Sequence, residues 1–129
     1  MYLTIRTDKP EAELGLFDGT EKIAYHTWEA HRQLAETIHH TIAALLDTSG
    51  LQMTDLKGIV VFSGPGSFTG LRIGVSVANA FADGLQIPIV GTQNEGWIAA
   101  GTNKLTNGDN DRIVLPEYGA EARTTQQRK

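Results

Sequence analysis

Residues 58–74 read Gly58-Ile-Val-Val-Phe-Ser-Gly-Pro-Gly-Ser-Phe-Thr-Gly-Leu-Arg-Ile-Gly74, and this segment constrains the architecture more than any other part of the chain. Its first part, Ile59–Phe62, is an unbroken run of β-branched and aromatic residues. Such a run is typical of a strand buried on both faces, as in a sheet covered by helices. The segment therefore predicts an α/β fold in which this strand is central.

A glycine turn follows the strand, and a helix is expected to begin near Phe68 because a side-chain oxygen just before it can cap the first turn. A strand, a glycine turn and a helix N-terminus in this order can bind an anion. The segment lacks the Lys-Ser/Thr pair of a P-loop, and Gly70 falls one position late for the dinucleotide pattern, so this signal is weak. The turn and its capping candidates are Gly64, Pro65, Gly66, Ser67 and Thr69.

Hydrophobic periodicity predicts strands and helices in the order βββαβαβα. Asp18-Gly19 is a strong hairpin signal between the second and third strands. This order predicts a mixed five-stranded sheet, with three antiparallel strands and two parallel strands reached by right-handed crossovers. The expected strands are 2–6, 12–17, 22–28, 59–62 and 87–90, and the expected helices are about 29–47, 68–84 and 95–100.

Composition limits the classes of protein that the chain can represent. The sequence has 129 residues, 40% hydrophobic residues, a net charge of -4 and no cysteine. This length fits one domain, and the negative charge gives no electrostatic footprint for direct binding of nucleic acid. No segment approaches the ~20 apolar residues that span a bilayer, and the N-terminus lacks the pattern of a secretory signal. We therefore expect a cytoplasmic protein without a disulfide framework or a thiolate metal site.

Residues 63–74, Ser-Gly-Pro-Gly-Ser-Phe-Thr-Gly-Leu-Arg-Ile-Gly, resemble the most characteristic segment of the TsaB (YeaZ) family. A looser resemblance extends from Met1 to about Gly101 and includes Glu29-Ala-His-Arg-Gln-Leu and Ile87-Pro-Ile-Val-Gly-Thr. The resemblance implies an actin/hexokinase-like, ribonuclease-H-type domain, which that family usually contains twice. It also implies a non-catalytic partner of the TsaD-type enzyme, which places threonylcarbamoyl on an adenosine next to the tRNA anticodon.

The composition changes after the resembling region. We expect an actin-like domain at 1–101, a polar linker at 102–112 and a C-terminal tail at 113–129. Within the tail, Ile113–Leu115 is a candidate for a short sixth strand, and Tyr118 is the expected anchor because its ring can pack while its hydroxyl stays wet. Pro116-Glu-Tyr-Gly-Ala-Glu-Ala-Arg123 faintly resembles the end of full-length family members. The sequence thus suggests that a second domain has been lost and the original terminus kept.

The second predicted helix has two contrasting faces. Ile73, Val77 and Phe81 form a bulky face suited to the sheet, whereas glycines and alanines at four-residue spacing form a small-residue face. A small-residue face lets another helix approach closely, either within the domain or from a partner. The residues alone leave both readings open, and the family resemblance favours the partner. The predicted interface is Leu34, Ile38, Phe68, Gly70, Leu71, Gly74, Ala78 and Ala82.

The sequence offers few candidates for catalysis. The four histidines do not complete a metal-ligand pattern, so a solvated helix face is the favoured interpretation. Ser67 and Thr69 are better explained as helix caps than as nucleophiles. Arg6-Thr7-Asp8 stands where the family typically has Asp-Thr-Ser, so the usual carboxylate anchor for magnesium-bound nucleotide is replaced by Arg6. The histidines are His26, His31, His39 and His40.

The resemblance therefore implies a non-catalytic scaffold subunit of the tRNA N6-threonylcarbamoyladenosine synthesis complex, and we expect no cofactor. The resemblance implies a heterodimer with the TsaD-type transferase, a further TsaE-type ATPase in the complex, and contact with tRNA only through that complex. Two alternatives remain open. One is a small actin-like nucleotide-binding phosphotransferase that uses the glycine turn, and the other is a self-associating homodimer without TsaD.

Overall fold

The computed structural model describes residues 1–30, 33–66 and 68–118. Five strands form one sheet in the order β3-β2-β1-β4-β5. β1, β2 and β3 form an antiparallel meander, whereas β4 runs parallel to β1 and β5 runs parallel to β4. The predicted mixed sheet is confirmed. The strands are β1 (Tyr2–Arg6), β2 (Glu11–Asp18), β3 (Glu21–Glu29), β4 (Gly58–Phe62) and β5 (Ile89–Thr92).

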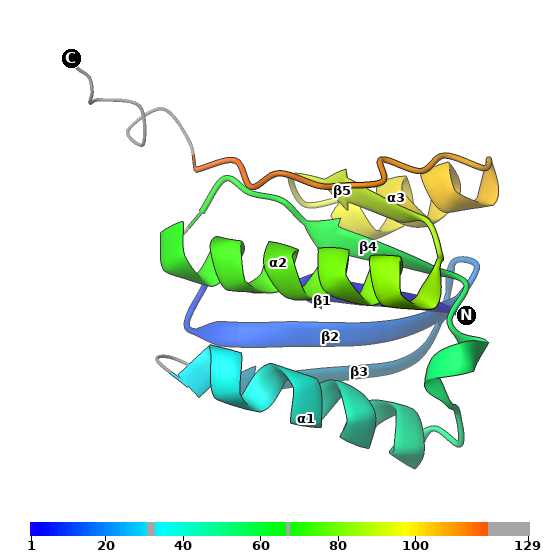
Figure 1. Cartoon of the computed structure of the whole chain (residues 1–129), viewed down its shortest axis with the longest axis horizontal. Coiled ribbons are helices and arrows are strands. Elements are labelled where there is room, and N and C mark those ends of the chain that lie inside the picture. Colours follow the sequence, from blue (N-terminus) through cyan, green and yellow to red (C-terminus); the bar gives the residue numbers. More distant parts are fainter. Residues whose placement is uncertain (31–32, 67, 119–129) are drawn as a thin grey trace.

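Helices cover the two faces of the sheet unequally. α1 (Leu34–Thr48) and α2 (Phe68–Leu85) lie side by side on one face, as Figure 1 shows. α3 (Trp97–Thr106) packs on β4 and β5 from the other face, because its Gly101 lies against Val60 while the next residue of β4, Val61, packs in the core below α2. A 3-10 helix, η2 (Met53–Asp55), leads from α1 to β4. The predicted order of strands and α-helices is confirmed.

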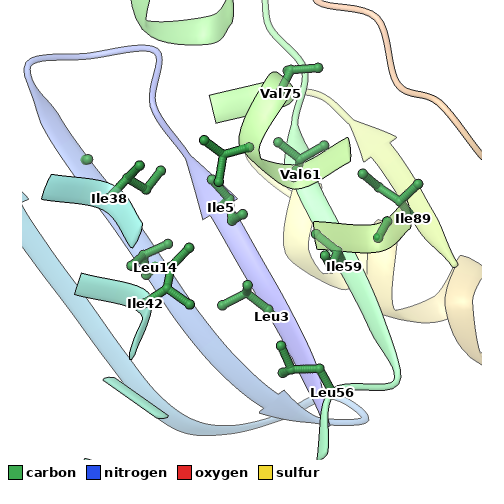
Figure 2. Close-up of a cluster of buried hydrophobic side chains, with 14 of the residues drawn as sticks. Leu3, Ile5, Leu14, Ile38, Ile42, Leu56, Ile59, Val61, Val75 and Ile89 are labelled. Carbon is green, nitrogen blue, oxygen red and sulfur yellow. The ribbon is translucent and has the colours of Figure 1, made fainter. Parts of the chain in front are cut away.

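The main core lies between the sheet and the pair α1–α2 (Figure 2). It is built from aliphatic side chains that alternate along the strands and recur along the helices. Each such side chain contributes roughly 1.5–3 kcal/mol when it is fully buried. A smaller cluster beneath α3 includes Phe62 and Trp97, whose rings meet edge to face at 5.7 Å. The labelled core residues are Leu3, Ile5, Leu14, Ile38, Ile42, Leu56, Ile59, Val61, Val75 and Ile89.

Two helix boundaries differ from the prediction. α1 begins at Leu34 rather than near Glu29, because Glu29 is still paired with Glu11 as the last residue of β3. α3 continues to Thr106, so the first five residues of the expected linker at 102–112 are helical. Thr102 and Leu105 are buried in that last part of α3, and this burial outweighs the polar composition that favoured a loop.

The segment after α3 runs back along the domain without forming the expected sixth strand. Only Val114 is buried in the triplet Ile113–Leu115, whereas Ile113 and Leu115 are 68% and 75% exposed. The backbone of Val114 pairs with the side chain of Asn79 on α2 instead of with a strand. Tyr118 packs against the smaller cluster, where an anchor was expected. The part of the predicted tail beyond residue 118 lies outside the described residues.

We predict that Gly74→Ala destabilises the fold. A Cβ at this position in α2 would lie 2.0 Å from Oγ1 of Thr7, and that hydroxyl is held by a 2.7 Å hydrogen bond to the carbonyl of Gly70. The substitution should lower the free energy of unfolding by about 1–3 kcal/mol, the usual effect of overpacking. Urea unfolding measures this change. Ser76→Ala, on the exposed side of the same helix, is the matched control, and equal midpoints for the two variants would contradict the prediction.

Candidate functional site

The glycine turn joins β4 to α2 at the carboxyl end of the sheet. Gly64 has φ +119°, and its bond to Pro65 is cis. A Cβ at Gly64 would lie 2.1 Å from the carbonyl oxygen of Glu117. The turn therefore needs glycine at this position, both because φ is positive and because the backbone of Glu117 leaves no room for a side chain. Thr69 is the second residue of α2 and therefore lies two positions beyond the N-cap, so it does not cap the helix as predicted. Ser67, the other capping candidate, lies outside the described residues.

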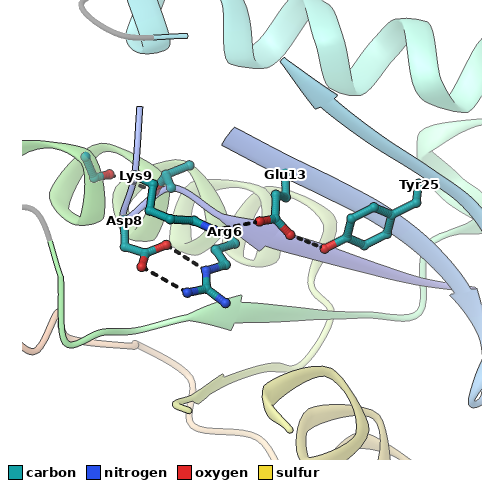
Figure 3. A network of polar contacts seen from close by, with 7 residues as sticks. Arg6, Asp8, Lys9, Glu13 and Tyr25 are labelled. Atoms are coloured by element: carbon teal, nitrogen blue, oxygen red, sulfur yellow. Dashed lines mark hydrogen bonds and ion pairs between the residues drawn. The ribbon is translucent and has the colours of Figure 1, made fainter. Parts of the chain in front are cut away.

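Arg6 and Asp8 fill the space between the end of β1 and the glycine turn (Figure 3). Nε and Nη2 of Arg6 donate to the two carboxylate oxygens of Asp8 at 2.7 and 3.1 Å. The guanidinium carbon also lies 4.0 Å from the centre of the Phe62 ring. A Cβ on Gly66 would lie 2.5 Å from Cβ of Asp8, so the turn packs directly on this pair. The hydrogen bonds to Asp8 raise the pKa of the Arg6 guanidinium. This cation is therefore already paired within the domain.

A second polar group lies beside this pair on the same sheet (Figure 3). The hydroxyl of Tyr25 donates to one carboxylate oxygen of Glu13, and Nζ of Lys9 lies 3.3 Å from the other. Burial of the ring, and then the bond to Glu13, raise the pKa of Tyr25 well above its ordinary value. The group is thus a stabilising network in which the phenol stays protonated at neutral pH.

The structure corrects the assignment of the two faces of α2. Ala78 and Ala82 are 0% and 3% exposed, and Gly74 lies against Thr7 at the end of β1, so the small residues face the sheet. The bulky residues are divided: Val77 packs in the core as predicted, whereas Ile73 and Phe81 are only partly buried, and Phe81 meets His39 of α1. A tightly packed helix needs small residues where its backbone comes closest to the sheet. Periodicity alone does not carry this constraint.

Most residues of the predicted interface consequently lie in the core of this domain. Side chains with almost no exposed surface cannot form a contact with a partner in this conformation, so close packing within the domain accounts for them. Gly70 is half-buried, and its carbonyl accepts the hydroxyl of Thr7. The side chain of Phe68 lies outside the described residues. The buried members are Leu34, Ile38, Leu71, Gly74, Ala78 and Ala82.

The opposite faces of α1 and α2 form an exposed surface, which we call the outer helix face. It comprises one row of residues on each helix. The residues of a row are four positions apart, so each row runs along one side of its helix. All of these residues are small except the histidine at the centre of the α1 row. The ring of His39 meets the ring of Phe81 edge to face at 5.5 Å, which links the two helices. A second pair of helices can approach such a surface closely. The rows are Ala35, His39 and Ala43 on α1, and Ser76, Ala80 and Gly84 on α2.

Sequence reasoning missed the second of these rows. Its signal is the spacing of Ser76, Ala80 and Gly84, which is the same as that of the inner row and only two residues out of phase. Because both rows consist of small residues, hydrophobicity does not indicate which row of α2 faces the sheet. The contact between Gly74 and Thr7 decides which row faces inward.

The described histidines are exposed; His39 and His40 lie on α1 as expected, whereas His26 lies on β3 and not on a helix. His26 stacks on Trp28 at 5.8 Å, and His39 contacts Phe81. Among residues 1–30, 33–66 and 68–118, no three acidic or histidine side chains are grouped so that they could hold a metal ion. In the same part of the chain, no helix has the length and apolar character needed to cross a membrane. His31 lies outside the described residues.

Comparisons with known proteins agree with the fold. The family model described as "TsaD: tRNA N6-adenosine threonylcarbamoyltransferase" matches residues 27–115. The chain is 34% identical over 84 residues to the tRNA threonylcarbamoyladenosine biosynthesis protein TsaB of Escherichia coli, covering 65% of this chain and 36% of that protein. It is 42% identical over 79 residues to TsaB of Bacillus subtilis, covering 61% and 32%. The structure of YeaZ from Pseudomonas aeruginosa superposes with a TM-score of 0.67 at 26% identity, over 72% of this chain and 43% of that one.

The sheet order and this superposition define an actin-like α/β domain, which confirms the predicted fold class. The chain belongs to the TsaB (YeaZ) family, and the TsaD family model matches more than half of it. It spans about a third of the length of the curated TsaB relatives that it matches.

We predict that Tyr25 makes stability fall at alkaline pH. Because folding raises the pKa of Tyr25, the protonated phenol stabilises the fold fully below about pH 10, the ordinary tyrosine value, and this contribution is lost as pH rises further. The difference in unfolding free energy between the wild type and Tyr25→Phe should therefore shrink above that pH. Urea unfolding across the alkaline range measures it. Glu13→Gln, which keeps the phenol but removes the carboxylate charge, should show a smaller loss, and a difference that stays constant with pH would contradict the prediction.

Proposed function

We propose that this chain is a non-catalytic scaffold subunit in tRNA N6-threonylcarbamoyladenosine biosynthesis, and that it binds a TsaD-type transferase through the outer helix face. The observation that carries this proposal is a two-helix surface of exposed small side chains on a domain of the TsaB family. The relatives named TsaB act in threonylcarbamoyladenosine biosynthesis, as their names state. The proposal extends that role to a chain that matches about a third of their length.

The shape of the outer helix face supports a helical partner. The small side chains let a second pair of helices approach to about 8–10 Å between axes, the distance of well-packed helices. His39 and Phe81, whose rings meet edge to face, add aromatic surface where α1 and α2 meet. Buried aromatic residues commonly supply much of the binding energy at protein interfaces. The same surface also fits a second copy of this chain, which is the homodimer alternative.

The pairing of Arg6 with Asp8 supports a non-catalytic role. A magnesium-bound triphosphate needs free carboxylate oxygens near the glycine turn. The carboxylate that lies there belongs to Asp8, and both of its oxygens accept hydrogen bonds from Arg6. Release of Asp8 for a metal would leave the half-buried guanidinium of Arg6 beside a cation. The geometry thus disfavours the alternative of an actin-like phosphotransferase.

The remaining parts of the proposal follow from the same role. The chemistry belongs to the TsaD-type transferase, and a TsaE-type ATPase supplies the nucleotide-dependent step. The chain carries a net charge of -4, so contact with tRNA is proposed only through the complex. A cytoplasmic location belongs to the same proposal.

We predict that Ala80→Arg weakens binding to the TsaD-type transferase from the same organism by about tenfold or more, equivalent to 1.4 kcal/mol or more. The long cation would hold the helices apart at the centre of the outer helix face, while the exposed position spares the fold. Calorimetric titration measures the affinity, and threonylcarbamoyl transfer to tRNA in the reconstituted system should fall in parallel.

The matched control is Ala100→Arg, which places the same cation at an exposed alanine of α3 on the other side of the sheet. It should bind the transferase as the wild type does. Equal affinities for the two variants would contradict the proposed surface. A wild-type chain that associates with itself but not with the transferase would favour the homodimer alternative.

A further inference from the structure

β5 is an edge strand of the sheet. The segment that follows α3 covers its outer side. We call this segment, residues 110–117, the strap. The backbone N–H of Ile89 donates to Oδ1 of Asn110 at 3.1 Å, and that of Gly91 donates to Oδ2 of Asp111 at 2.9 Å. The carbonyl of Ile89 accepts from the backbone N–H of Asp111 at 2.8 Å. Three outward-facing groups of the edge are thus satisfied by two residues.

The strap is fixed at two further points. Both backbone groups of Val114 bond to the side-chain amide of Asn79 on α2, each at 2.9 Å. The backbone N–H of Glu117 donates to the carbonyl of Ser63 at 2.7 Å, just beyond β4. The side chain of Val114 lies over Gly91, where a Cβ would come within 2.6 Å of it. Figure 1 shows the strap as the orange segment that runs along β5.

The strap covers β5 in a different way from a sixth strand, which would pair through backbone groups alone. Two of the three bonds to β5 come from side chains, so the strap can leave without breaking any hydrogen bond between strands of the sheet. An unpaired edge is a template for another extended chain. β5 reads Ile-Val-Gly-Thr, which is uncharged and rich in β-branched residues, the composition that pairs readily.

We propose that the edge of β5 is a pairing site for β5 of a second copy of this chain, and that Asn110 and Asp111 of the strap close it. Two copies of an uncharged strand can pair about a two-fold axis without placing like charges opposite each other. With the strap in place, Asp111 puts a carboxylate at the edge of each copy, which opposes pairing. This site lies apart from the outer helix face and does not depend on the proposed partner.

The test compares Asn110→Ala/Asp111→Ala with Asp109→Ala in the full chain. Both lose one negative charge, but Asp109 bonds neither Ile89 nor Gly91. Amide hydrogen exchange at Ile89 and Gly91 reports whether the edge is covered. Light scattering over a range of protein concentration reports the mass. Both variants also carry Ala80→Arg, so that any dimer is not formed through the outer helix face.

In dilute solution, the double variant should lose protection at Ile89 and Gly91 by about tenfold or more while the amides of β1 keep theirs. At high concentration the protection should return and the mass should double. The Asp109→Ala control should stay protected and monomeric throughout. If the double variant loses protection in β1 as well, Asn79→Ala, which releases the strap from outside the sheet, is judged by the same two measurements.

Two results would overturn the proposal. Full protection of Ile89 and Gly91 in the dilute double variant would show that Asn110 and Asp111 do not close the edge. Lost protection with a monomeric mass at every concentration would show that the edge does not accept a second copy. Failure of binding to a TsaD-type transferase has no bearing on either result.

Discussion

The close contact between α2 and the end of β1 is the constraint on which the rest of the structure depends. Gly74 leaves no room for a side chain beside Thr7, and the hydroxyl of Thr7 bonds to the carbonyl of Gly70 one turn earlier. This contact sets the rotation of α2, so Ala78 and Ala82 face the sheet and Ala80 faces outward. The same rotation brings Phe81 to α1. The outer helix face is therefore a consequence of packing at a single glycine.

The fold followed from the sequence because its signals are local. The apolar run before the glycine turn, the Asp18-Gly19 hairpin and the stripe of α1 each specify one element without reference to the others. The candidate site did not follow, because the two small-residue rows of α2 are distinguished only by Thr7, which lies 67 residues away from Gly74 in the sequence. The path of the strap could not be predicted for a similar reason. Its partner Asn79 is a polar residue, and hydrophobic periodicity takes no account of polar residues.

The site near the glycine turn is built from contacts within the domain. The family resemblance predicts an aspartate where Arg6 stands, and the structure shows that Arg6 is paired with Asp8 and lies over the ring of Phe62. The polar groups at the end of β1 are therefore engaged in interactions within the domain. The turn still positions the first turn of α2 and accepts the strap at Ser63 and Gly64. The turn thus holds both α2 and the strap in place.

The most direct test of this account is a magnetic resonance titration of the labelled chain with its TsaD-type transferase, followed through alanine methyl groups. The chain offers exposed alanines on both sides of the sheet: Ala35, Ala43 and Ala80 on the outer helix face, and Ala99 and Ala100 on α3. The account predicts shifted or broadened signals for the first three and unchanged signals for the two on α3. Perturbation confined to α3, with the outer helix face unaffected, would contradict it.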